Sequence, residues 1–454
     1  MDKKNIWEKR EAGTLQEFCE DYRVFLSGHK TERENVSGMI KELEKAGAVK
    51  LEDAISGASK PQAGDLIYAD MMKKSLLVFR VGKKPLTEGA RFLGAHIDSP
   101  RLDLKQHPLY EDSDLAMLDT HYYGGIKKYQ WVTLPLALHG VVVRKDGTSV
   151  DVCIGEKPTD PVFGVSDLLI HLAAKQMDKK VAQAVTGENL NILVGSKPLA
   201  GEESESVKKN ILAILKEEYN IEEDDFMSAE IEVVPAGEAR DYGFDRSMIM
   251  GYGQDDKVCA YTSFRAILDE KEPEYTSICL LTDKEEIGSV GATGMHSRFF
   301  ENTLAELMNL LGCYSELELR RVLTRTKVLS SDVSAGMDPN YPEVMERKNC
   351  AYLGRGPVFN KYTGARGKSG SNDANAEYMG FLRGLLEKED ISYQTAELGK
   401  VDEGGGGTIA YILANLGMEV IDFGVAVLNM HAPWEITNKA DIYEAYLAYR
   451  AFLR

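Results

Sequence analysis

The sequence predicts an α/β protein in which a mixed sheet is sandwiched between helices and a β-rich segment is inserted into the chain. From about residue 255 onward, helical patterns alternate with short apolar strands, which is typical of a sheet covered by helices. Residues 105–245 are instead rich in hairpin signals. At 454 residues the chain exceeds the size that one hydrophobic core usually supports. We therefore expect one domain formed by 1–104 and 246–454, and an inserted domain formed by 105–245.

The first part of the chain is expected to contain two helices followed by three strands. Apolar residues recur at helical spacing in 14–28 and 32–53, and Thr14 with Glu17 has the pattern of a helix cap. Three short β-rich runs follow, at 65–71, 75–82 and 91–98. The last run, "RFLGAHID", ends in polar residues, which matters for the site considered below.

The inserted segment begins with hairpins and ends with helical patterns. Residues 131–155 alternate apolar and polar positions around Asp146-Gly147, a dipeptide that favours tight hairpin turns. A helical patch at 166–178 and an acidic helix at 203–224 are expected after it.

After the inserted segment, the chain returns to alternating helices and strands. Helices are expected at 255–270, 315–326, 371–388, 408–417 and 440–453, and strands at 275–282, 327–333, 392–398 and 419–426.

Composition excludes several classes of function. The net charge of −18 argues against nucleic acid or an anionic membrane as the main partner, since both require a cationic face. The N-terminus lacks the apolar core of a secretory signal, and no run reaches the ~18–20 apolar residues of a membrane span. The six cysteines are scattered without a CxxC pair, which favours reduced thiols and a cytoplasmic location.

Familiar nucleotide and hydrolase motifs are missing from the sequence. "GYGQDD" at 251 lacks the third glycine of a dinucleotide loop, and "RGKSGS" at 366 lacks the first glycine of a phosphate loop. HExxH and GxSxG do not occur. "GGGG" at 404–407 precedes a helix and brings backbone close to a ligand or holds an anion, but alone it is weak evidence.

Two histidines at apparent strand ends suggest a metal. His96 is followed two residues later by Asp98, and residues i and i+2 of a strand share a face, so Asp98 can orient His96. His431 follows another β run in "VLNMHAPWE". A single histidine of this kind is more often structural than metal-binding.

Three acidic segments have the same placement. Asp255 and Asp256 open a helix, Glu285 and Glu286 follow an apolar strand in "LTDKEEIG", and Asp332 follows another. Each could be a helix cap or a solvated turn. Five segments converging on the carboxyl ends of strands instead suit a pair of divalent metals bridged by a carboxylate and a water. Zinc is favoured by the imidazoles, and Mn or Co is also compatible with such ligands.

The adjacent glutamates fit this interpretation. Two neighbouring carboxylates repel each other, but nearby cations stabilise both in their ionised forms. One glutamate can bind metal while the other acts as a general base toward the bridging water. Spacing alone leaves open which residue does which.

Over almost its whole length, the chain resembles the aminopeptidase I/aspartyl aminopeptidase family of di-zinc metallopeptidases. The segments that carry the resemblance are "GAHIDSPRLDLK", "YYGGIKKYQWVTLPLALHGVVV", "DLLIHL", "LTDKEEIGS", "SSDVSAGMDPNYPE", "DEGGGGTIA" and "NMHAPWE".

The resemblance implies a role for each candidate residue. It makes Asp255 the bridging ligand of two metals, Glu285 the general base and Asp98 the residue that orients the first histidine. The full implied ligand set is His96, Asp255, Glu286, Asp332 and His431. The implied substrate-contacting residues are Lys361, Gly406, Gly407, Thr408, Asp338 and Asp167. The family also implies short peptides as substrates, a dimerisation role for the inserted domain, and dimers that assemble into a tetrahedral dodecamer.

Two departures from the aspartyl branch bear on specificity. Asp338 in "MDPNYPE" and Asp167 in "VSDLLIHL" stand where that branch has histidines, the second of which reaches a neighbouring subunit's site. Aspartates at both positions disfavour an acidic substrate side chain. We therefore expect a preference for neutral or basic N-terminal residues.

The sequence thus predicts a metalloaminopeptidase acting on short peptides. A di-metal deacylase or carboxypeptidase is the first alternative, and it requires a pocket for a substrate carboxylate. A catalytically silent scaffold of the same fold is the second alternative.

Overall fold

A computed structural model describes residues 5–57 and 60–454. It confirms the predicted fold class, with mixed sheets and covering helices. The chain divides into two compact units. The first unit contains the chain up to Asp98, Ala239–Met430 and Glu435–Arg454, and the second contains Ser99–Glu238 and His431–Trp434. None of the helices within the described residues is both long and apolar enough to cross a membrane.

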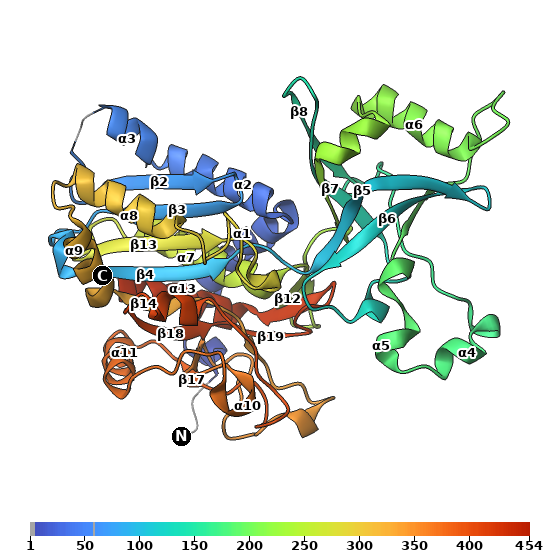
Figure 1. Ribbon diagram of the computed structural model, residues 1–454. Coiled ribbons are helices and arrows are strands. Elements are labelled where there is room, and N and C mark those ends of the chain that lie inside the picture. Colours follow the sequence, from blue (N-terminus) through green and yellow to red (C-terminus); the bar gives the residue numbers. More distant parts are fainter. Residues whose placement is uncertain (1–4, 58–59) are drawn as a thin grey trace. The chain divides into compact units, whose positions relative to one another are not determined.

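The first unit is built on a nine-stranded sheet with helices on both faces (Figure 1). Its strands, in spatial order, are β1 (Val49–Lys50), β2 (Leu66–Met71), β3 (Ser75–Arg80), β13 (Thr276–Thr282), β4 (Ala90–His96), β14 (Lys327–Ser330), β18 (Glu419–Gly424), β16 (Val358–Asn360) and β17 (Gln394–Thr395). The four central strands, β13, β4, β14 and β18, run parallel to one another. Their carboxyl ends therefore meet at one edge of the sheet.

The strands of this sheet are apolar on both faces because a hydrophobic cluster covers each face. On β14, Leu329 belongs to one cluster and Val328 to the other, as the strand's alternation requires. The first cluster contains side chains of α1 (Ala12–Gly28), α2 (Glu32–Lys45), α7 (Gln254–Asp269), α11 (Ala376–Lys388) and α13 (Lys439–Leu453). The second contains side chains of α3 (Leu51–Gly57), α8 (Phe299–Leu310), α9 (Glu316–Arg325) and α12 (Ala410–Ala414).

A smaller five-stranded sheet completes the first unit. Its order is β11 (Arg240–Tyr242), β12 (Met248–Gly251), β20 (Glu435–Asn438), β19 (Ala426–Leu428) and β15 (Ser334–Ala335). It contains the segment that leads into α7 and the segments that follow β14 and β18.

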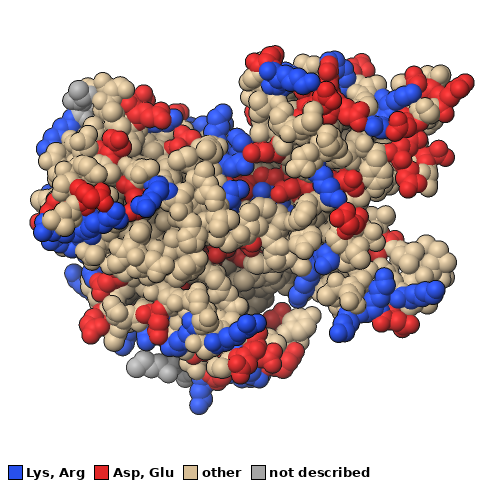
Figure 2. Space-filling view, in the orientation of Figure 1, with Lys and Arg blue, Asp and Glu red and all other residues tan. Residues whose placement is uncertain are grey.

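The second unit is a six-stranded sheet with one long helix. The strands, in order, are β8 (Ser149–Ile154), β7 (Leu136–Val143), β10 (Ala229–Pro235), β5 (Arg101–Asp112), β6 (Leu115–Tyr123) and β9 (Ile192–Gly195). The expected hairpin at Asp146-Gly147 is confirmed by the antiparallel pairing of β7 with β8. The helix expected at 203–224 is the shorter α6 (Ser206–Tyr219), which is not itself acidic, because most of the acidic residues lie in the segments that flank it. Acidic and basic side chains are mixed around it (Figure 2), and Lys208 of α6 pairs at 2.8 Å with Glu223 of the 3₁₀ turn Glu223–Ser228.

Several local predictions need correction. The first helix is capped by Glu11, whose carboxylate accepts the N–H groups of Gly13 and Thr14, and it therefore begins before Thr14. The helix expected at 166–178 is reduced to a 3₁₀ turn at Ile170–Leu172 and one turn of helix, α4 (Ala174–Met177). Its large apolar side chains are exposed rather than packed in a core, which removes the main stabilising term of an amphipathic helix.

Candidate metal centre

Candidate ligands lie at the carboxyl ends of three neighbouring parallel strands, at one edge of the main sheet. His96 is the last residue of β4, and Asp332 comes two residues after the end of β14. Glu285 and Glu286 follow β13 on a 3₁₀ turn, Glu285–Ile287. Because these strands are adjacent and parallel, residues more than 200 positions apart in the chain meet at the same edge.

His96 lies in a first group of possible ligands with Asp255 and Glu286. One ligand atom from each of the three lies within 4.8 Å of the others. The imidazole Nε2 of His96 is 3.2 Å from Asp255 Oδ1, and both side chains are buried. The buried Glu435 accepts the backbone N–H of Asp255 at 3.0 Å and so fixes the start of α7. No local sequence pattern signals this role of Glu435.

A second group contains His96, Asp256 and Asp332, again with ligand atoms within 4.8 Å of one another. Asp256 is fully buried and its Oδ1 has no hydrogen-bond partner within the described residues, while its Oδ2 accepts the His96 N–H at 3.4 Å. In the sequence, Asp256 stands out only as the neighbour of Asp255. Its position in this group is set by the turn at the start of α7, where neither aspartate has helical dihedral angles.

The electrostatics of the two groups favour a bound cation. Burial raises the pKa of Asp256 well above its usual range, and burial together with repulsion from Asp256 does the same for Asp332. At His96, burial lowers the pKa, but the hydrogen bonds to Asp255 and Asp98 raise it more. Since one imidazole and four carboxylates are nitrogen and oxygen donors suited to zinc, the residues present fit this metal.

Asp98 connects the histidine with the glutamate turn. His96 Nδ1 lies 3.0 Å from the carbonyl oxygen of Asp98 and 3.3 Å from its Oδ1. The two carboxylate oxygens of Asp98 accept the backbone N–H groups of Glu285 and Glu286, each at 3.1 Å. One buried carboxylate therefore positions the histidine ring and the backbone of both glutamates.

A close approach between β18 and the end of β14 shapes the same edge. A Cβ atom at Gly424 would lie 1.9 Å from the carbonyl oxygen of Asp332. Any larger residue at this position would displace the backbone that carries Asp332.

His431, the fifth predicted ligand, belongs to the second unit. Its Nδ1 lies 2.8 Å from the carbonyl oxygen of Gly125, and its backbone has φ of 64°, in the left-handed region. Its part in metal binding stays a prediction.

The predicted substrate-contacting residues of the first unit lie on loops. Lys361 Nζ is 3.3 Å from Asp373 Oδ1, and Asp338 Oδ1 accepts the Asn340 N–H at 2.8 Å. In the glycine-rich segment, Gly406 donates to Thr363 O at 3.0 Å, whereas a Cβ atom at Gly407 would have no neighbour within 4 Å. A cavity of about 230 Å³ is lined by Tyr362–Lys368 and by residues of the segment 397–405.

Asp167 lies on the surface of the second unit. It accepts hydrogen bonds from its neighbour Leu168 and from Gln176 Nε2, the latter at 3.0 Å.

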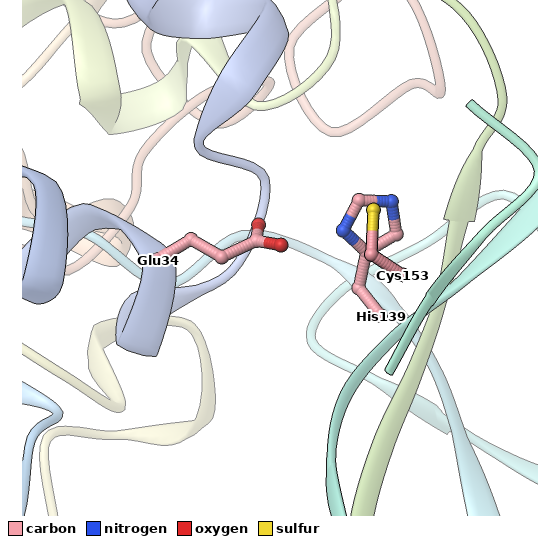
Figure 3. A group of neighbouring side chains, drawn as sticks. All are labelled: Glu34, His139 and Cys153. Carbon is pink, nitrogen blue, oxygen red and sulfur yellow. The ribbon is translucent and has the colours of Figure 1, made fainter. Parts of the chain in front are cut away.

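Figure 3 draws two residues that face each other across β7 and β8 of the second unit, His139 and Cys153, together with Glu34 of the first unit. His139 Nε2 is 2.9 Å from Glu156 Oε1, so this ring already has a carboxylate partner within its own unit. Cys153 is exposed, and all six cysteines are free thiols, as the sequence predicts. We assign no metal to this pair.

Comparison with known proteins identifies relatives over the whole chain. The model of the family "aminopeptidase I zinc metalloprotease (M18)" matches residues 25–453. A protein of Clostridium acetobutylicum named probable M18 family aminopeptidase 1 is 62% identical over 99% of this chain and 98% of its own length. The crystal structure of the M18 aminopeptidase of Thermotoga maritima has a TM-score of 0.97 at 46% identity, covering 100% of this chain and 99% of that one. The S. cerevisiae mApe1 dodecamer shares the fold at 18% identity, with a TM-score of 0.76 over 96% of both chains.

Proposed function

Because the chain belongs to the M18 aminopeptidase I family of zinc metalloproteases, we propose that it removes N-terminal residues from short peptides with two divalent metals and a glutamate base. That it is a zinc-dependent aminopeptidase, a peptide-bond hydrolase, follows from family membership. What we propose beyond this is that two metals are bound, which residues bind them, and which residue acts as the base.

The convergence of two ligand groups on His96 carries this proposal. The groups share only that histidine and otherwise offer four different carboxylates, which is enough for two cations held side by side. We propose that Asp255, Asp332 and Glu286 are ligands together with His96, and that His431 is the fifth, as the family resemblance implies. Asp256 is an additional candidate because its buried Oδ1 has no other partner among the described residues.

Bound zinc would supply Lewis acidity toward the scissile carbonyl and lower the pKa of the attacking water. Glu285 would accept a proton from that water and return it to the departing amine. The N–H bonds from Glu285 and Glu286 to Asp98 hold the backbone of the turn that carries both carboxylates, which supports the proposal of a separate role for each.

A panel of aminoacyl-anilides and N-acylated amino acids tests the reaction class. Protein reconstituted with Zn, Mn or Co should cleave the anilides, because a free α-amine is the feature an aminopeptidase recognises. Cleavage of N-acylated amino acids alone would establish the deacylase or carboxypeptidase alternative. Absence of turnover with every metal and substrate would establish the silent scaffold.

The same panel tests the side-chain preference. Asp338 and Asp167 stand at positions where the aspartyl branch has histidines, so we propose faster cleavage of neutral or basic residues than of Asp or Glu. A faster reaction with Asp-anilide than with Leu-anilide would contradict this.

We further propose that the protein self-associates through the second unit. An apolar patch on this unit, formed by Leu169, Ile170, Leu172, Met177 and Val181, has side chains between 55% and 71% exposed. Exposed patches of this kind mark interaction surfaces in folded proteins. A dodecamer, as in the S. cerevisiae relative, is the assembly we propose.

A further inference from the structure

A row of polar side chains crosses three adjacent strands of the main sheet. Ser330 on β14 is the register partner of Asp422 on β18, and Asp422 is the register partner of Asn360 on β16. Register partners lie side by side with their side chains on one face. All three residues are at most 3% exposed.

This row interrupts an otherwise apolar surface. Two residues earlier on the same strands, Val328 and Val420 belong to the hydrophobic cluster that covers this face. Ile409 and Leu413 of the segment that follows Thr408 belong to the same cluster, and a Cβ at Gly94 on β4 would meet Ile409 at 3.2 Å. The glycine-rich segment therefore leads directly onto the face that carries the row.

The carboxylate in the middle of the row has hydroxyl neighbours but no counter-charge. Neither Asp422 oxygen has a well-formed hydrogen bond, nor does Ser330 Oγ, and no salt bridge reaches Asp422 among residues 5–57 and 60–454. Asn360 donates its Nδ2 to Ala396 O at 3.0 Å, which leaves its Oδ1 as the group it offers to the row. The groups that Ser330, Asn360 and Thr408 can offer to a cation beside Asp422 are therefore oxygens.

Asp422 keeps a pKa below neutral pH despite its burial. Burial raises its pKa, whereas the hydroxyls of Thr408 and Ser330 lower it as hydrogen-bond donors to the carboxylate, and the pKa comes to about 6. An ionised carboxylate buried without a counter-charge costs several kcal/mol. A bound positive charge would remove that cost.

We propose that Asp422, Ser330, Asn360 and Thr408 form a binding site for one monovalent alkali cation, Na⁺ or K⁺, separate from the zinc ligands. Alkali cations are hard ions that take oxygen ligands, and the row offers a carboxylate, hydroxyls and an amide oxygen. One monovalent ion balances the single carboxylate. A divalent ion would leave a net positive charge buried, and zinc would favour nitrogen or sulfur donors that the row lacks.

The site would anchor the glycine-rich segment. Thr408 is the residue that joins Gly406 and Gly407 to α12, so a cation shared by Thr408 and Asp422 fixes that segment to the sheet. The cation would therefore order the backbone before a peptide arrives, without taking part in bond cleavage.

Thermal unfolding of the zinc-loaded protein in chloride salts tests the site. Ionic strength is kept constant with choline chloride while NaCl or KCl is varied. We expect the unfolding midpoint to rise in a saturable manner with one of the two ions, by roughly 2 °C or more. The rise should be absent in Asp422→Asn, which is neutral. The matched control is Asp441→Asn: Asp441 is also fully buried, but its two oxygens accept the N–H groups of Gly354 and Gly356, so its cation response should equal that of the wild type.

Equal midpoints in all salts would overturn the proposal, as would an alkali-specific rise that persists in Asp422→Asn. If that variant does not fold, Ser330→Ala serves instead. It keeps the charge and removes one ligand, so the half-saturating cation concentration should increase several-fold.

Crystals of the zinc-loaded protein grown with RbCl provide the direct measurement, with an anomalous peak expected between Asp422 and Thr408. These readouts do not depend on peptidase activity, so the proposed function and the cation site can fail independently.

Discussion

His96 Nδ1 lies 3.0 Å from the carbonyl oxygen of Asp98 and 3.3 Å from its carboxylate, which directs Nε2 toward Asp255. Asp98→Asn weakens this orientation and also removes one of the two acceptors for the backbone of the glutamate turn. We expect zinc affinity to fall about 10- to 100-fold, the usual effect of losing such a partner. Competition with a chromogenic chelator measures it. An unchanged zinc affinity would show that the ring is held by the backbone carbonyl alone.

The two adjacent glutamates should respond differently to the same substitution. Glu285→Gln is expected to abolish nearly all turnover while the metal content stays at the wild-type level, because a base is lost and a ligand is not. Glu286→Gln is expected to lose metal. Elemental analysis measures the metal content of both purified variants, and kcat on an aminoacyl-anilide measures their turnover. The reverse pattern would exchange the two assignments.

Asp256 provides a prediction that the sequence alone does not make. Its buried Oδ1 has no partner within the described residues, and its ligand group contains His96 and Asp332. We expect Asp256→Asn to bind less zinc per subunit than the wild type. Asp373→Asn, which alters an ion pair with Lys361, should keep full metal content and serves as the control. Full zinc content in Asp256→Asn would show that Asp256 only positions the His96 backbone.

Asp441 predicts a pH dependence of stability away from the metal centre. Burial raises its pKa to about 7, above the ordinary value of 3.8 for an aspartate. Between these two pH values the folded protein binds a proton that the unfolded chain has released. This group's contribution therefore favours folding most below about pH 4 and declines as pH rises toward 7, by ~4 kcal/mol in total.

Asp441→Asn removes this titration. Urea midpoints of the wild type and the variant, measured from pH 4 to 8, should shift in favour of the variant as pH increases. A constant difference between the two proteins would mean that Asp441 stays ionised throughout, held by the N–H groups of Gly354 and Gly356.

The apolar patch of the second unit predicts an effect on assembly. Ile170 is 69% exposed, so Ile170→Asp should leave folding intact while opposing burial of this surface. We expect sedimentation velocity to show a smaller species than the wild type. Val24→Asp, at a 56% exposed position on α1 of the first unit, is the matched control and should sediment like the wild type. Identical species for all three proteins would exclude the patch as an interface.

The hydrophobic periodicity and the positions of charged residues in the sequence were sufficient to predict the fold class and to identify most of the candidate ligands. The alternation of Val328 with Leu329, and of Val420 with Ile421, marks strands buried on both faces. The polar residues that follow β4, β13 and β14 are visible as interruptions of apolar runs. Because the carboxyl ends of parallel strands meet at one edge, the convergence of such residues can be expected from their positions in the sequence.

The tertiary structure decided what depends on contacts between distant segments. The place of Asp256 beside Asp332, the bond from Glu435 to Asp255 and the row from Ser330 to Asn360 each join residues at least 30 positions apart. No local pattern encodes these pairings, because strand order and register arise from the packing of the whole sheet. The sequence by itself therefore determined which residues are available for chemistry, and only the folded chain determined which of them meet.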